Sequence, residues 1–355
     1  MILSYIFAVF AVLGAIDKII GNKFGLGKEF EKGFMLLGPM ALTMIGMIAI
    51  APVIAHCLKP LFGFIYDVFK IDPSIIPASI LANDMGGASL SKEIAQNDVL
   101  GAFNGLIVSS MMGVNISYTI PVSLGLVKKD NQKDMFLGFL CGLVTIPIGC
   151  FVSGLVLKIN ALTLLYNLLP LVIFAFLIVL GLIFIQKLCI KIFDVLGKVI
   201  NIIITIGLIF ALWQFLTGNV ILENLDTYEN GGMICLNAAA VLAGAFPLMH
   251  VISFILKKPL KFLGKKVNLN ESSVLGFLST SVSCLPTFGI MEKMDRKGIV
   301  LNSAFIISAA FTFGSHLAFT MAFDKAYVLS MIIGKLVSGI CAVIVASFIV
   351  RKKDG

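Results

Sequence analysis

The sequence predicts an all-α protein that crosses a membrane many times. The chain of 355 residues has a mean hydropathy of +1.05, and 13% of its residues are charged, against about 25% in soluble domains. Long apolar runs recur along the whole chain, and each is long enough to cross a hydrocarbon core of about 30 Å. The polar connections between them are too short to bury a core of their own, so no soluble domain is expected.

Eleven hydrophobic segments are expected, of which about nine are transmembrane helices and two are re-entrant hairpins. The nine spans are residues 2–20, 34–57, 99–126, 135–157, 161–186, 199–217, 232–256, 299–323 and 326–350. The remaining segments, 73–97 and 273–295, are apolar in their first half and polar in their second half. Polar backbone and side chains are not expected to face lipid, so each segment is either one polar span or a re-entrant hairpin.

The distribution of positive charge favours the hairpins. If both segments return to the side they left, most of the 27 Lys and Arg residues gather on one side of the membrane. Apart from Lys335, which lies within a span, the other side holds Lys59, Lys70, Lys92, Lys158 and Lys325. If both segments crossed the membrane fully, the Lys and Arg residues would be spread over both sides and this bias would be lost. Because positive charge marks the cytoplasm, we expect the N-terminus outside and the C-terminus in the cytoplasm of an inner-membrane protein.

A weak internal repeat relates the two halves of the chain. Lys59 and Pro60 match Lys258 and Pro259 at an offset of 199, and Asn104 and Ser117 match Asn302 and Ser315 at an offset of 198. Five membrane crossings separate the start of the first copy from the start of the second. Because this number is odd, the second copy is inverted in the membrane relative to the first. Inverted repeats with paired broken segments are typical of secondary transporters. The prediction is therefore an inverted-repeat transporter fold in one domain, 1–355, with repeat 1 at about 1–157, a linking helix at about 161–198 and repeat 2 at about 199–355.

The first polar segment carries candidate substrate-binding residues at its tip. Gly86 and Gly87 let the chain reverse and bring bare backbone close to a ligand. Asn83 and Asp84 come just before them, and an ionisable side chain at membrane depth is by default a functional candidate. Asp84 either holds a cation or caps a half-helix. Glu93 is a further candidate, although with Lys92 it also fits a solvated ion pair.

The second polar segment and the spans after both segments supply the other candidates. Ser283 and Thr287 either bind a substrate hydroxyl or bond back to helix carbonyls. Polar side chains in the two following spans either bind substrate or hold helices together: Asn104, Asn115 and Ser117, then Asn302, Ser315 and His316. His316 is either a proton relay or a hydrogen-bonded structural residue.

Other classes of function lack their motifs. There is no GxxxxGK[ST] and no HExxH, GxSxG or CxxC, so neither ATP-driven pumping nor catalysis is expected. The seven cysteines are scattered singly, so no metal site is expected, and no cofactor is expected either. The net charge of +8 lies in short loops beside spans, so the partner is the lipid bilayer and not nucleic acid. A homo-oligomer is compatible with this pattern.

Five ordered motifs resemble the bacterial ethanolamine-utilisation permease family (EutH type). They are "ILANDMGGASLSKE", "GLIVSSMMG", "VTIPIGC", "PTFGIMEKMDRKG" and "LNSAFIISAAFTFGSHLAF", and the likeness covers nearly the whole chain. The resemblance implies uptake of protonated ethanolamine across the inner membrane, and it carries over most directly to Asp84, Glu93, Asn302 and His316. The chain departs from the family pattern at Ser283, Cys284 and Ser315, where some members carry two amides and an acidic residue.

Ethanolamine is a small ammonium alcohol, so its site needs a carboxylate or an aromatic face for the cation and a polar group for the hydroxyl. Asp84 with Asn83 can supply the first, and Ser283, Asn302 and Ser315 can supply the second. The expected function is a permease that works by alternating access or facilitated diffusion. Two alternatives stay open: an ion-coupled carrier of another small amine or zwitterion, and an intramembrane enzyme that acts on ethanolamine lipids.

Overall fold

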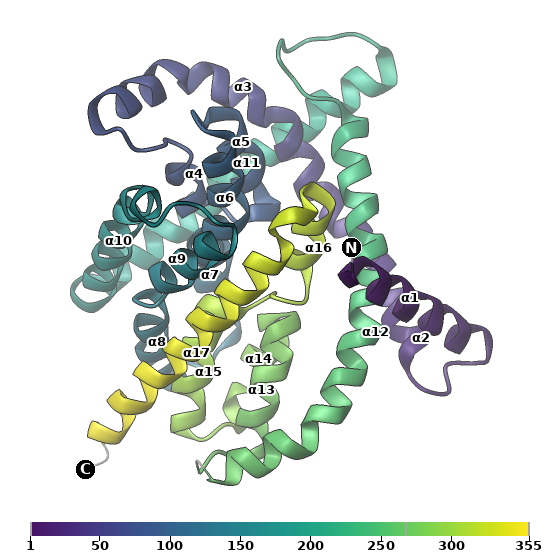
Figure 1. Ribbon diagram of the computed structural model, residues 1–355, viewed down its shortest axis with the longest axis vertical. Coiled ribbons are helices and arrows are strands. Elements are labelled where there is room, and N and C mark those ends of the chain that lie inside the picture. Colours follow the sequence, from purple (N-terminus) through teal and green to yellow (C-terminus); the bar gives the residue numbers. More distant parts are fainter. Residues whose placement is uncertain (1, 267, 354–355) are drawn as a thin grey trace.

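The computed structural model describes residues 2–266 and 268–353, and every regular element in them is a helix (Figure 1). In this part of the chain, 8 helical segments are long and apolar enough to cross a membrane. They are Ile2–Ile19, Leu26–Phe69, Asp98–Leu126, Lys129–Val156, Ala161–Phe184, Gln186–Thr217, Tyr228–Phe262 and Lys325–Val350. Eight of the nine expected spans correspond to these segments, so the polytopic all-α prediction is confirmed.

The described part of the chain contains both long helices and groups of short ones. The long helices are α1 (Ile2–Ile19), α3 (Leu37–Phe69), α10 (Ala161–Phe184), α11 (Gln186–Thr217), α12 (Tyr228–Lys266) and α17 (Val328–Lys353). The shorter α-helices are α2 (Leu26–Met35), α4 (Ile75–Ile80), α5 (Gly87–Ile94), α6 (Asp98–Phe103), α7 (Ile120–Leu126), α8 (Lys129–Leu143), α9 (Ile146–Val156), α13 (Glu271–Val282), α14 (Cys284–Ile290), α15 (Arg296–Ala309) and α16 (Ser315–Phe323). Three are 3₁₀ turns, η1 (Asn83–Met85), η4 (Met291–Lys293) and η5 (Lys325–Tyr327), and two are π-helical, η2 (Asn104–Gly113) and η3 (Asn115–Thr119).

The segment 299–323, expected as one membrane-spanning helix, is instead two helices, α15 and α16. The chain between them lies against α13, where the backbone N–H groups of Phe311 and Phe313 donate to the carbonyls of Thr280 (3.2 Å) and Ser281 (2.7 Å). A break at this depth is tolerated because neighbouring protein satisfies the freed backbone groups. Hydropathy could not reveal it, because the residues at the break are themselves mostly apolar.

Two other boundaries differ from expectation. Residues 187–198, which lie between the expected spans 161–186 and 199–217, are the first turns of α11. Lys198 pairs there with Asp194 one helical turn earlier (2.7 Å). The helices α3 and α12 extend well beyond their apolar spans, and each contains two prolines: Pro52 and Pro60 in α3, Pro247 and Pro259 in α12. At 33 residues, α3 is about 50 Å long, more than the hydrocarbon core needs.

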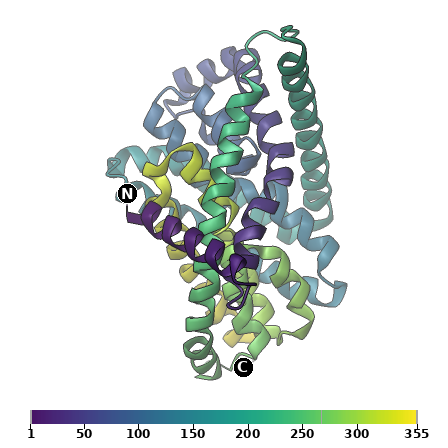
Figure 2. The ribbon, with the colours of Figure 1, turned by 90° about the vertical axis from the view of Figure 1, so that its right-hand side faces the viewer.

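The helices form a buried centre with a lipid-facing rim. The segment Asp98–Leu126 lies at the centre, where 83% of its most apolar stretch is buried, whereas the corresponding figure for α1 is 17%. Figure 2 shows α12 (green) running through the height of the molecule while α1 (purple) crosses it. The helices α3 and α11 cross closely at Gly46 and Gly207, where a side chain on either glycine would meet the backbone of the other helix.

Candidate functional site

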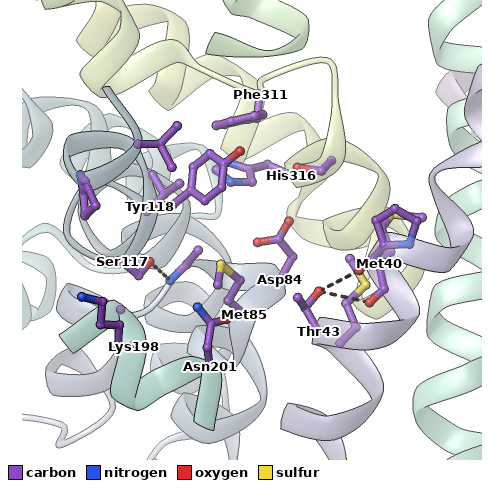
Figure 3. Close-up of a pocket in the computed structure, with 18 of the residues that line it drawn as sticks. Met40, Thr43, Asp84, Met85, Ser117, Tyr118, Lys198, Asn201, Phe311 and His316 are labelled. Atoms are coloured by element: carbon purple, nitrogen blue, oxygen red, sulfur yellow. Dashed lines mark hydrogen bonds between the residues drawn. The ribbon is translucent and has the colours of Figure 1, made fainter. Parts of the chain in front are cut away.

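A cavity of about 460 Å³ lies where the η1 turn, the end of η3 and the broken chain before α16 meet. The helices α3 and α11 close its other side. Figure 3 shows Asp84 projecting into this cavity, with Tyr118, Phe311 and His316 on one side and Met40 and Thr43 on the other. The cavity is therefore built from segments that are far apart in the sequence. The carboxylate of Asp84 lies near its middle, and the ion pair of Asp194 and Lys198 also lines it.

The backbone around Asp84 is held tightly. Met85 and Gly87 donate their N–H groups to the carbonyl of Ala82 (3.1 and 2.8 Å), which closes the turn. Gly86 follows with φ of 102°, a left-handed conformation that a side chain would strain. The Ala82 N–H donates to the Ser117 hydroxyl (3.1 Å), which anchors the turn to η3. The carboxylate of Asp84 is thus presented to the cavity by a fixed backbone.

Aromatic rings and a hydroxyl surround the Asp84 carboxylate. Ser315, at the start of α16, is a hydrogen-bonding neighbour of Asp84. The rings of Tyr118 and Phe311 meet edge to face, with centroids 6.0 Å apart, and the ring of Phe311 lies 5.0 Å from that of His316. Phe311 has φ of 63°, a costly conformation for a bulky residue and one that often marks a functional site.

Lys335 is a buried charge behind this cavity. Its side chain is 1% exposed, and its ammonium donates to the carbonyl of Ser110 (2.5 Å) and lies 3.1 Å from Nδ1 of His316. Its charge also interacts with that of Asp84. Ser110 lies in the π-helix η2, and π-helical turns are frequently found at functional sites.

The first hairpin, residues 72–97, is closed at its base by one carboxylate. Asp72 is buried, and its two oxygens accept hydrogen bonds from Ser74 (N and Oγ) and from the N–H groups of Gln96 (3.0 Å) and Asn97 (2.9 Å). Because residues from both ends meet on one side chain, the segment returns to the place where it began. The amide of Asn104 then donates to Ser74 Oγ (2.8 Å).

The second hairpin, residues 270–295, is closed in a similar way with the roles of its ends exchanged. Here the carboxylate is at the far end, and Asp295 accepts from the N–H of Asn270 (3.1 Å) and the hydroxyl of Ser273 (2.7 Å). The amide of Asn302 donates to the carbonyl of Ser273 (2.8 Å). The two predicted amides, Asn104 and Asn302, therefore each bond a serine at the base of a hairpin, through its hydroxyl in Ser74 and through its carbonyl in Ser273.

A second cavity, of about 690 Å³, lies beside the tip of the second hairpin. Ser283 lines it together with Glu29, Lys32 and Lys257. Three residues line both cavities, namely Tyr118, Phe311 and Ser315. These three side chains consequently separate the two cavities.

Ion pairs join the second hairpin to its neighbours outside the spans. Glu292 bonds Lys128 (2.7 Å), and this hydrogen bond and the negative charge of Glu292 raise the pKa of the Lys128 ammonium. Lys261 bonds Glu271 (3.0 Å), and this hydrogen bond and the Lys261 charge lower the pKa of the Glu271 carboxyl. These pairs are exposed, so each contributes little to stability.

The structure brings together some of the predicted site residues and separates others. Asp84, Ser117, Ser315 and His316 line the first cavity, and Ser283 lines the second. Among the described residues, the remaining candidates line neither cavity: Asn83, Gly86, Gly87, Glu93, Asn104, Asn115, Thr287 and Asn302. Gly86 and Gly87 shape the turn, whereas Glu93 is exposed at the end of α5.

Several of these remaining candidates hold helices together. Asn115 donates to the carbonyls of Met111 (2.5 Å) and Ile307 (2.7 Å), which joins η3 to α15. Thr287 bonds the hydroxyl of Thr280 (2.9 Å) and the carbonyl of Gly276 (3.1 Å) between the arms of the second hairpin. Asn83 donates to Thr320 (3.5 Å) on α16. For Asn115 this is the interhelical bonding weighed as its alternative, and the bond of Thr287 to the Gly276 carbonyl is the bonding to a helix carbonyl weighed for that residue.

Sequence reasoning did not single out Tyr118, Phe311 or Lys335. Lys335 had a usable signal, because it is the sole charged residue in the expected span 326–350, and ionisable residues inside spans are commonly functional. Tyr118 and Phe311 had none, because the chain contains 29 Phe and 6 Tyr residues, most of which suit a lipid-facing or core position equally well. Their role becomes visible only through their position around Asp84.

Comparison with known proteins gives a consistent result. A family profile described as "Ethanolamine utilisation protein, EutH" matches residues 1–349. A protein of Listeria monocytogenes named "Probable ethanolamine permease EutH" is 43% identical over 351 residues, which cover 99% of this chain and 94% of the relative. Proteins of the same name from Escherichia coli and Salmonella typhimurium are each 37% identical, covering 99% of this chain and 96% of theirs. No solved structure matches the chain.

Proposed function

Since the chain belongs to the EutH family of ethanolamine utilisation proteins, we propose that it is a permease, not an enzyme, that takes up ethanolamine across the cytoplasmic membrane. An aliphatic amine of this kind is protonated at neutral pH, because its pKa lies near 10 as for lysine. The transported species is therefore the ammonium form, which does not cross a hydrocarbon core unaided.

The position of Asp84 is the observation that carries this proposal. A carboxylate that projects into a cavity next to the rings of Tyr118 and Phe311 offers an ammonium group both a charge-assisted hydrogen bond and an aromatic face. Ser315 beside Asp84 is placed to bond the substrate hydroxyl. Because ethanolamine is much smaller than the cavity of about 460 Å³, it would occupy the part beside Asp84.

The proposed architecture is a pair of inverted repeats, and the helix bounds support it. The first hairpin begins with α4 at Ile75 and the second with α13 at Glu271; α6 begins at Asp98 and α15 at Arg296, an offset of 198. The proline-containing helices α3 and α12 precede the hairpins in the two halves, and α10 has no counterpart. The π-helical stretch η2–η3 in the first half and the break before α16 in the second fall at comparable places, so two irregular stretches would meet at the substrate site.

We further propose that both hairpins are re-entrant and that the Lys-rich ends face the cytoplasm, with the N-terminus outside. Contacts between loops agree with the expected sides. On the Lys-rich side, Arg296 bonds Asp134 (3.2 Å) and Lys128 bonds Glu292. On the Lys-poor side, Lys92 lies 5.5 Å from the ring of Phe323. In Figure 1 the C-terminus and the end of α12 lie at the same end of the molecule.

Uptake by the purified protein in liposomes tests the proposal. Labelled ethanolamine is supplied near pH 6, where almost all of it is protonated, and liposomes without protein give the background. We expect saturable uptake that unlabelled ethanolamine inhibits and that ethylene glycol, which lacks the ammonium group, does not. Uptake equal to that of the empty liposomes would contradict the proposal. Stronger inhibition by a zwitterion such as glycine would instead favour the second carrier hypothesis.

A further inference from the structure

The charges around Asp84 constrain what happens when a cation binds there. Among the described residues, His316 from α16 contacts the ammonium of Lys335, and the groups of Asp84 on η1 and Cys150 on α9 act on it electrostatically. With Asp84 ionised and Lys335 protonated, and with Asp194 paired to Lys198 at the cavity wall, the empty site is neutral. A substrate ammonium at Asp84, which is half-buried, would add one positive charge beside Lys335, Cys150 and His316, which are all at most 1% exposed. An unbalanced charge next to a buried ammonium is strongly unfavourable.

The contact between Lys335 and His316 offers a way to restore neutrality. A lysine ammonium has only donors, so Nδ1 of His316, 3.1 Å away, must be the acceptor, and Nε2 then carries the ring proton. His316 also lines the first cavity, whereas Lys335 does not. The ring therefore lies between the buried ammonium and the space that the substrate enters, which is the position a proton relay requires.

We propose that the protein exchanges one protonated ethanolamine for one proton, with Lys335 as the group that releases and regains the proton. When substrate binds at Asp84, an Nζ–H bond of Lys335 breaks and an Nδ1–H bond of His316 forms. The Nε2–H bond of His316 then breaks, and that proton passes to water in the cavity. One positive charge enters the site and one leaves it. Release of substrate on the other side reverses these steps. This inference rests on the proposed ethanolamine transport.

The exchange has a thermodynamic consequence that a uniporter of the cation does not share. Because each cycle moves one positive charge inward and one outward, the membrane potential does no work on it. Ethanolamine accumulates on the more acidic side, ten-fold for each pH unit of difference at equilibrium. A uniporter would instead follow the potential, ten-fold for about 59 mV.

The experiment sets the pH difference and the potential separately in liposomes that contain the full chain. With an acidic interior and no potential, we expect labelled ethanolamine to accumulate; with a negative interior and no pH difference, we expect none. Accumulation that follows the potential and ignores the pH difference would overturn the exchange while leaving ethanolamine transport intact. Uptake no greater than in liposomes without protein would overturn the transport proposal and this inference with it.

Variants of Lys335 provide a second test with a readout beyond activity. Lys335→Gln removes the exchangeable proton, so the loaded site is neutral and the empty site negative, and the remaining uptake should follow the potential. Lys335→Arg keeps a charge that is not released, and its remaining uptake should follow the potential as well. Lys92→Gln, at an exposed lysine on α5, is the matched control and should follow the pH difference. Variants that still follow the pH difference would remove Lys335 from the mechanism.

Discussion

The first and second hairpins have equivalent bases and different tips. Each base is closed by one carboxylate, a serine and an amide from the following helix, although the carboxylate stands at the start of one hairpin, in Asp72, and at the end of the other, in Asp295. The first tip carries a charged side chain into a cavity, whereas the second, around Ser283, carries a hydroxyl. The base is therefore shared scaffold, and the chemistry that recognises an ammonium group lies in one tip.

Among substitutions at the two tips, Asp84→Asn should cause the largest loss of ethanolamine uptake. The change keeps the shape of the side chain and removes its charge, so it weakens a charge-assisted bond by about 3 kcal/mol, which corresponds to a loss of uptake of about a hundred-fold. Initial rates of labelled ethanolamine uptake measure it. Glu223→Gln, at an exposed acid in the loop before α12, is the control and should retain the wild-type rate. Uptake by the Asp84 variant above a tenth of wild type would contradict the proposed role of this carboxylate.

The two base carboxylates should differ in their contribution to stability. Asp72→Ala leaves the N–H groups of Gln96 and Asn97 without their partner and should lower the free energy of unfolding by about 2 kcal/mol. Asp295 is only partly buried, so Asp295→Ala should cost about 1 kcal/mol. Thermal unfolding of both variants in one detergent measures the difference. Equal decreases in the unfolding temperature would show that burial of the carboxylate does not determine how much each hairpin base contributes to stability.

Substitutions of Phe311 and Tyr118 should change the affinity for ethanolamine only where they remove the aromatic ring. Phe311→Leu removes a π face beside Asp84 and should weaken the apparent affinity for ethanolamine by about ten-fold, the equivalent of about 1.4 kcal/mol. Tyr118→Phe keeps its ring and should change the affinity by less than about two-fold on the same scale. Competition curves with unlabelled ethanolamine give both values. If the leucine variant binds as tightly as wild type, the ammonium does not lie against Phe311.

Substitution of Ser283 in the second tip should have the smallest effect on ethanolamine uptake. Ser283 lines only the second cavity, and its hydroxyl accepts a long bond from the N–H of Leu285 (3.4 Å) at the start of α14. Removing so weak a bond should change both uptake and stability little, so Ser283→Ala is expected within about two-fold of wild type. Uptake of labelled ethanolamine by the Ser283→Ala and Asp84→Asn variants, measured in the same assay, compares the two tips directly. A loss as large as that of the Asp84 variant would place substrate at both tips.

The sequence sufficed for the helical class and for part of the site. Hydropathy located eight membrane-spanning segments, because apolar runs of this length are typical of helices that cross a bilayer. The rarity of an acid at membrane depth was enough to select Asp84, which does project into the cavity. The same logic applied to Lys335 would have found the buried ammonium beside His316.

What the sequence could not reveal depends on contacts between distant residues. The break between α15 and α16 exists because carbonyls of α13 take its N–H groups, and no local pattern records that partnership. Asn104 and Asn302 looked like equivalent substrate residues because they repeat at a fixed offset. In the structure each of them bonds a serine at the base of a hairpin, so a fixed offset in the sequence marks residues that hold the scaffold as well as candidates for substrate binding.

Ammonium binding at Asp84 can be seen directly in a structure determined with bound ethanolamine. We predict that the ammonium nitrogen lies about 2.8 Å from a carboxylate oxygen of Asp84, the usual length of a charge-assisted bond, with the rings of Tyr118 and Phe311 around it. Ethanolamine bound at the second tip, beside Ser283 and away from the Asp84 carboxylate, would contradict this prediction.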